Sequence, residues 1–143
     1  MAEVVMAMTV FMMMTLMFAA VVPIALKETQ QSGNYNEAAL LAQHKMDQLR
    51  TVNFDDLANS TKLTSDGIID SVNTNGSYDF SSTSSDNLAA YFPTGTTGTI
   101  TVATDTTAGT MSGGVYNVTI TIAWPSSATS AGSFTIEDKI INY

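Results

Sequence analysis

The chain opens with a long apolar segment, and its charged positions come afterwards. Val4 to Leu26 are 23 consecutive residues without a charged side chain, and Glu3 directly precedes them. As an α-helix rising about 1.5 Å per residue, this segment would be about 35 Å long, enough to cross a hydrocarbon core of about 30 Å. Pro23 lies inside it and lacks an N–H, so we expect a helix break or kink around residues 19–23.

Helical spacing continues beyond the apolar segment. From Tyr35 to about Leu57, apolar side chains recur every three or four residues, which predicts an amphipathic helix. The positions that share this stripe are Ala38, Leu41, Ala42, the aliphatic part of Lys45, Met46, Leu49 and Val52. Glu37 lies early in this helix and Arg50 lies late, an order that suits the helix dipole.

The C-terminal half alternates polar and apolar positions. Alternation over residues 98–103, 115–124 and 134–141 predicts half-buried antiparallel strands, with turns at 111–114 and 125–132. Residues 58–93 are rich in Ser, Asn, Asp and Gly and predict a polar connection. The expected fold class is α+β, with one long N-terminal helix packed on a small antiparallel β-sheet head.

Three segments follow from these patterns. Residues 1–27 form an apolar helix, residues 28–57 an amphipathic helix half, and residues 58–143 a β-rich head. The 143 residues suffice for about one domain. Seven of the nine Met residues lie within the first 17 positions. Because Met is unbranched and polarizable, it fits irregular gaps between packed helices.

Composition excludes several classes of function. The net charge is −8, with five Lys and Arg residues against thirteen Asp and Glu. Nucleic-acid binding is disfavoured, because phosphate contacts need clustered basic side chains. The chain has no Cys, so disulfides, thiolate metal sites and a Cys nucleophile are excluded.

Catalytic and metal chemistry find little support in the sequence. His44 is the only histidine, and we interpret it as a helix surface residue. Asp55, Asp56 and Asp66 could offer carboxylates to calcium, but the spaced acids of the twelve-residue calcium loop are missing. Helix capping explains these acids more simply. We therefore predict no catalytic residue, no metal, no cofactor and no enzyme activity.

Three N-x-[ST] sequons occur in the chain, at Asn59, Asn75 and Asn117. Asn117 falls in an expected strand, so Asn59 and Asn75 are the better glycosylation candidates. Residues 81–87 (SSTSSDN) form a small low-complexity patch. We interpret this patch as a solvated loop, with a glycan-bearing or partner-contacting surface segment as the alternative.

The apolar segment admits three interpretations. A cleavable secretory signal would have a basic start and a shorter apolar stretch, whereas here the flank is acidic and Lys27 follows the run. A plain membrane anchor accounts for the apolar residues but leaves Glu3 without a partner, and carboxylates at such places are costly. A filament subunit whose helix packs among copies of itself gives Glu3 a partner in a neighbour.

Two segments carry a resemblance to a known family. Residues 2–11 (AEVVMAMTVF) resemble the N-terminus of type IV pilins and pseudopilins, in which a Glu opens a long apolar helix. Residues 40–50 (LLAQHKMDQLR) resemble a pattern of the minor-pilin-like branch. The resemblance covers roughly residues 1–57. The family's glutamate corresponds to Glu3, although here it is third rather than fifth, so we expect either two preceding residues or a different docking geometry.

The resemblance implies a processing and assembly pathway as well as a fold. A prepilin peptidase would remove a leader, the helix would anchor the subunit in the inner membrane, and pilus assembly machinery would build a homo-oligomeric extracellular filament. Glu3 would pair with the N-terminal amine of a neighbouring subunit. The predicted function is therefore a structural subunit of a type IV pilus-like filament. A minor pilin or type II secretion pseudopilin is one alternative, and a monomeric membrane-anchored exported binding domain is another.

Overall fold

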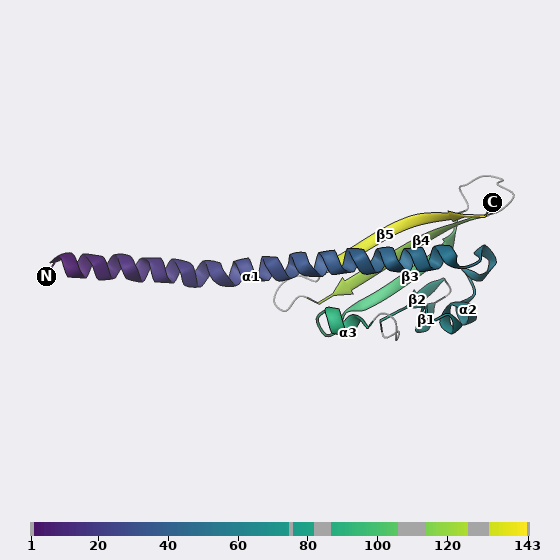
Figure 1. Ribbon diagram of the computed structural model, residues 1–143, viewed down its shortest axis with the longest axis horizontal. Coiled ribbons are helices and arrows are strands. Elements are labelled where there is room, and N and C mark those ends of the chain that lie inside the picture. The colour runs from purple at the N-terminus through teal and green to yellow at the C-terminus, as the bar shows by residue number, and fades with distance from the viewer. Residues whose placement is uncertain (1, 75, 82–86, 106–113, 126–131, 143) are drawn as a thin grey trace. The chain divides into compact units, whose positions relative to one another are not determined.

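A single helix, α1, occupies the first third of the chain and runs from Ala2 to Thr51 (Figure 1). It continues through Pro23, so the predicted helix break is wrong as an interruption of the helix. Proline removes only one backbone donor, the one that would bond the carbonyl of Ala19, and the hydrogen bonds on either side maintain the helix. A bend around residues 19–23 stays a prediction.

The computed structural model describes residues 2–74, 76–81, 87–105, 114–125 and 132–142, with the side chains of 73 and 74 left aside. The chain forms two compact units, with the boundary between Gly33 and Asn34. We call residues 34–142 the head. Its elements after α1 are a 3₁₀ turn η1 (Phe54–Asp56), α2 (Ser60–Ser65), β1 (Ser71–Thr74), β2 (Ser77–Asp79), α3 (Leu88–Tyr91), β3 (Thr97–Thr104), β4 (Val115–Trp124) and β5 (Gly132–Ile141).

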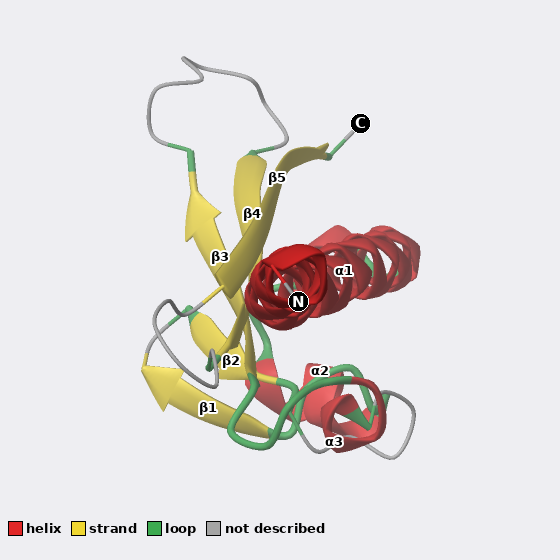
Figure 2. Cartoon of the chain, turned by 90° about the vertical axis from the view of Figure 1, so that its left-hand side faces the viewer, coloured by secondary structure: helices red, strands yellow, loops and turns green. Residues whose placement is uncertain are grey.

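The strands of the head form one antiparallel sheet in the order β1-β2-β3-β4-β5, so each strand pairs with its neighbour in the chain. The predicted strands over 98–103, 115–124 and 134–141 are confirmed as β3, β4 and β5. With the Asn34–Thr51 part of α1 on one face of this sheet, the α+β prediction is confirmed (Figure 2). The predicted turns at 111–114 and 125–132 lie largely outside the described residues.

The core of the head forms between the helix stripe and one face of the sheet. Four apolar residues of α1 are buried, namely Ala38, Ala42, Met46 and Leu49. They meet the apolar face of β4, where Val118, Ile120, Ile122 and Trp124 are buried. Leu41 and Val52 are half-buried at the margin of this core. The helical and strand periodicities of the sequence therefore identify the residues that face one another.

Two predicted features of the head are wrong. The amphipathic helix was expected to reach about Leu57, but α1 ends at Thr51, because the extended backbone of Asn53 (φ −59°, ψ 141°) leaves the helical path. The predicted polar connection over 58–93 contains two short helices and two short strands. Its scattered apolar residues are buried and hold these elements in the core: Leu63, Ile68, Ile69, Tyr78, Phe80, Leu88 and Phe92.

Two glycines let large aromatic rings lie against the sheet. A Cβ at Gly98 would come within 2.5 Å of the Phe80 ring, and a Cβ at Gly132 within 2.4 Å of the Trp124 indole. Both rings are buried, so neither has room to move away. The Trp124 ring also packs edge-on against Tyr35 of α1, with centroids 5.0 Å apart. Absence of a side chain at these glycines is thus what permits the aromatic packing.

Candidate membrane stem and head surface

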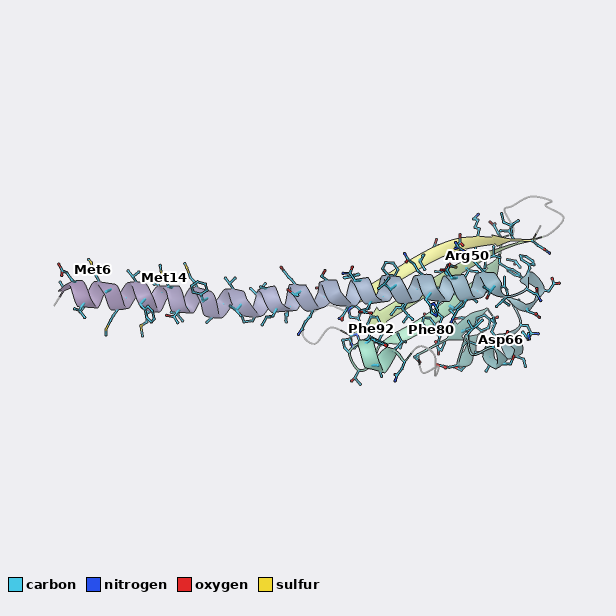
Figure 3. All side chains as sticks on the ribbon, viewed as in Figure 1. Met6, Met14, Arg50, Asp66, Phe80 and Phe92 are labelled. Carbon is cyan, nitrogen blue, oxygen red and sulfur yellow. The ribbon has the colours of Figure 1, made fainter. Side chains whose placement is uncertain are left out.

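We call Val4–Leu26 the stem, and its apolar side chains are exposed all around α1. Each large apolar residue of the stem has between 50% and 73% of its surface exposed, from Val22 to Met6 and Phe11. Side chains extend both above and below this part of the helix in Figure 3, where Met6 and Met14 are labelled. In a soluble helix one face would be polar. The stem therefore needs an apolar environment on all sides, supplied by lipid or by other helices.

Within the described residues, α1 is the one helix long and apolar enough to cross a membrane, judged by length and composition. The only polar side chains of the stem, those of Thr9 and Thr15, are compatible with a membrane span. Thr9 Oγ1 lies 3.0 Å from the carbonyl oxygen of Val5 and 2.9 Å from that of Met6, and Thr15 Oγ1 donates to Phe11. Both hydroxyls are satisfied inside the helix, as hydrocarbon surroundings require.

Glu3 lies in the first turn of α1. A carboxylate in the first turn of a helix lies near the positive end of the helix dipole. The first residue lies outside the described residues, so the structure does not place the amine that the family resemblance assigns to Glu3. The docking role of Glu3 stays a prediction.

The head contains a buried charge that periodicity alone did not predict. Lys45 is fully buried, whereas the sequence assigned only its aliphatic part to the core. Its Nζ donates to the Ile68 carbonyl at 2.9 Å and lies 5.3 Å from the centroid of the Phe80 ring. These contacts join α1 to the segment between α2 and β1, through Ile68, and to the end of β2, through Phe80. Burial of a lysine requires such partners, but sequence spacing does not show where they come from.

Two ion pairs fix the edge strand β5 from opposite faces. Arg50 of α1 donates from Nε and Nη2 to Asp138 Oδ2, at 3.1 and 2.8 Å. These bonds lower the pKa of the Asp138 carboxyl and raise that of the Arg50 guanidinium. The next residue, Lys139, reaches Asp105 beyond β3 at 2.7 Å. No local sequence pattern indicates these pairs, because their members are far apart along the chain.

The structure brings together only part of the candidate metal residues. Asp56 and Asp66 line one groove of about 400 Å³, together with Lys62. The Lys62 Nζ lies 3.6 Å from Asp66 Oδ1. Asp55 does not line it. His44 is exposed on α1 and pairs with the Gln48 amide at 3.1 Å. Among the described residues, no group of three or more His, Asp or Glu side chains is arranged to hold a metal ion.

The glycosylation candidates differ in their surroundings. Asn59 is exposed and caps α2, because its Oδ1 accepts from the N–H groups of Thr61 and Lys62. This cap uses the amide oxygen, whereas a glycan would be attached through the amide nitrogen, so the two are compatible. Asn75 lies outside the described residues, as does most of the 81–87 patch. Asn117 lies within β4, between neighbouring strands on both sides.

Comparison of the chain with protein-family models, curated proteins and solved structures finds no match.

Proposed function

We propose that this chain is a structural subunit of a type IV pilus-like extracellular filament, held in a membrane by its stem before assembly. The observation that carries the proposal is the stem itself, whose apolar side chains are exposed on every face of a continuous helix. The position of Glu3 directly before the stem supports assembly in addition to anchoring, because a neighbouring subunit's amine would neutralise its charge.

Assembly would replace lipid around the stem by the stems of other copies. Both surroundings are apolar, so removal of stem surface from water contributes little to the difference between the two states. Close packing of side chains and the pairing of Glu3 would then favour the filament. The Met residues of the stem suit this task, since their flexible thioethers adapt to several neighbours. Extraction from the membrane would need energy from pilus assembly machinery.

Filament formation by a Glu3 variant tests the proposal. Glu3→Ala is expected to lower the number of filaments seen by electron microscopy at least tenfold, while the subunit remains in the membrane fraction. Glu28→Ala is the matched control, because the same substitution removes another exposed acid of α1 that lies beyond the stem. Normal filament numbers with Glu3→Ala would refute the docking role.

A monomeric membrane-anchored exported domain is the second candidate, because the head has its own core and its own boundary at residues 33 and 34. This second candidate predicts that Glu3→Ala has no effect and that the subunit stays monomeric in the membrane. A minor pilin or type II secretion pseudopilin stays the alternative within the filament class, and it would depend on Glu3 in the same way.

A further inference from the structure

Thioether side chains are concentrated in the stem to an unusual degree. Six described Met residues lie there, at positions 6, 8, 12, 13, 14 and 17, with exposed fractions between 58% and 73%. Met46, in the core of the head, is 2% exposed. Leu or Val would provide similar apolar surface without sulfur, so the choice of Met adds a chemical reactivity that the membrane span itself does not need.

The stem has no spare hydrogen-bond donor for an oxidised methionine. Its only side-chain donors are the hydroxyls of Thr9 and Thr15, and both already donate to carbonyls of the preceding turn. The backbone N–H groups within the helix are used by the helix itself. A sulfoxide oxygen in this segment would therefore be an unpaired polar acceptor surrounded by hydrocarbon, which is unfavourable.

We propose that the stem methionines are an oxidation site for small peroxides and that their oxidation releases the stem from its apolar surroundings. Each thioether sulfur attacks one oxygen of hydrogen peroxide. An S–O bond forms, the O–O bond breaks, and the second oxygen leaves as water with both protons. Sulfur loses two electrons and the peroxide gains them. Hydrogen peroxide is small and uncharged, so it reaches residues inside a bilayer.

This inference rests on the membrane stage of the proposed function. Oxidation acts on subunits in the membrane, where lipid surrounds the stem, and converts an apolar helix into one that carries several unpaired acceptors. Oxidised subunits would be lost from the pool that supplies assembly. Met46 would be protected by the core of the head, which provides an internal reference in the same molecule.

Vesicle binding of the full chain before and after oxidation tests the inference. The chain is reconstituted into phosphatidylcholine vesicles, treated with hydrogen peroxide and separated by flotation, and peptide mass spectrometry locates the added oxygens. We expect sulfoxides at the stem methionines, an unmodified Met46, and a fall of at least about tenfold in the ratio of bound to free protein. A methionine sulfoxide reductase should restore binding.

The matched control replaces the six stem methionines by Leu, which keeps the stem apolar and helical. This variant should stay bound after the same treatment. Equal retention of wild type and variant, with sulfoxides present in the wild-type stem, would overturn the inference, as would oxygen added to Met46 but not to the stem. If untreated wild type failed to float, the membrane stage of the proposed function would itself be refuted before any oxidant is added.

Discussion

Lys45 shows how one residue can join separate parts of the head. Its side chain lies in the core, and its ammonium donates to the Ile68 carbonyl over the face of Phe80. A buried carbonyl that loses its donor costs free energy, whereas the aliphatic part of the side chain can be replaced by a similar volume. The two contributions can therefore be separated by substitution.

Lys45→Met keeps most of the buried volume and removes the donor. We expect the free energy of unfolding to fall by about 1–3 kcal/mol, because the Ile68 carbonyl loses this hydrogen bond. Urea unfolding of the full chain in detergent, followed by fluorescence of the single Trp, measures the change. Lys62→Met is the control, since that lysine is half exposed and its loss should cost less than about 0.5 kcal/mol. Equal stability of Lys45→Met and wild type would contradict this role.

Gly98 tests the close approach of Phe80 to the sheet. Gly98→Ala places a methyl group 2.5 Å from a buried ring, so we expect destabilisation by about 1–3 kcal/mol. Gly33→Ala is the matched substitution in α1, where the added Cβ has no atom within 4 Å apart from its chain neighbours and the helix's own backbone. That change should be neutral or should stabilise the helix by up to about 1 kcal/mol. The urea unfolding midpoints of both variants measure these changes in stability. A midpoint for Gly98→Ala equal to that of wild type would show that Phe80 does not pack closely against Gly98.

The edge strand β5 depends on charges supplied by other elements. Arg50 lowers the pKa of Asp138 below its ordinary value of 3.8. A lowered pKa means that the ionised carboxylate stabilises the head above about pH 4, and that this contribution is lost as the pH falls through the lowered pKa. Acid should therefore weaken the attachment of β5 to α1.

Asp138→Asn isolates this contribution. We expect the variant to be less stable than wild type at pH 7, with a difference that shrinks below about pH 4, because wild type then loses the same interaction. Urea midpoints at pH 7 and pH 3 measure the two differences. Glu37→Gln, on an exposed position of α1, should show no such convergence. A difference for Asp138→Asn that is unchanged at pH 3 would rule out this ion pair as its source.

Elements with a strong period could be predicted from the sequence, and the irregular ones could not. Strands β3, β4 and β5 alternate over eight to ten residues, and the stripe of α1 repeats every three or four residues. By contrast, β2 is three residues long and α3 is four, too short for either period to show. Isolated apolar residues such as Phe80 and Leu88 stabilise these elements only through contacts with distant parts of the core.

The stem could be predicted from the sequence for the same reason, whereas the contacts of the head surface could not. An uncharged run of 23 residues is a local signal, and the exposed stem follows from it directly. The full burial of Lys45 and the Arg50–Asp138 pair depend on how distant segments meet, which no local pattern specifies. Pro23 illustrates the opposite error, because a local rule predicted a break where the flanking hydrogen bonds maintain the helix.

The chain as a whole joins two units with opposite solvent requirements. The head has a core of its own beginning at Asn34, so a fragment of residues 34–143 should fold without the stem. We expect this fragment to be soluble and monomeric and to unfold in one cooperative transition, monitored by Trp fluorescence and far-ultraviolet circular dichroism. A fragment that remains unfolded would show that the stem contributes to the core of the head.

The proposed filament requires that stems pack against one another, and cysteine cross-linking tests this claim. The chain has no cysteine, so Met13→Cys introduces one thiol in the middle of the stem. Bifunctional maleimide treatment of cells that produce this variant should yield covalent dimers, because each subunit carries one thiol and each reagent joins two. Ser65→Cys, on α2 of the head, should yield no such dimers. Monomers alone from Met13→Cys, under conditions in which the thiol is fully modified, would contradict the claim.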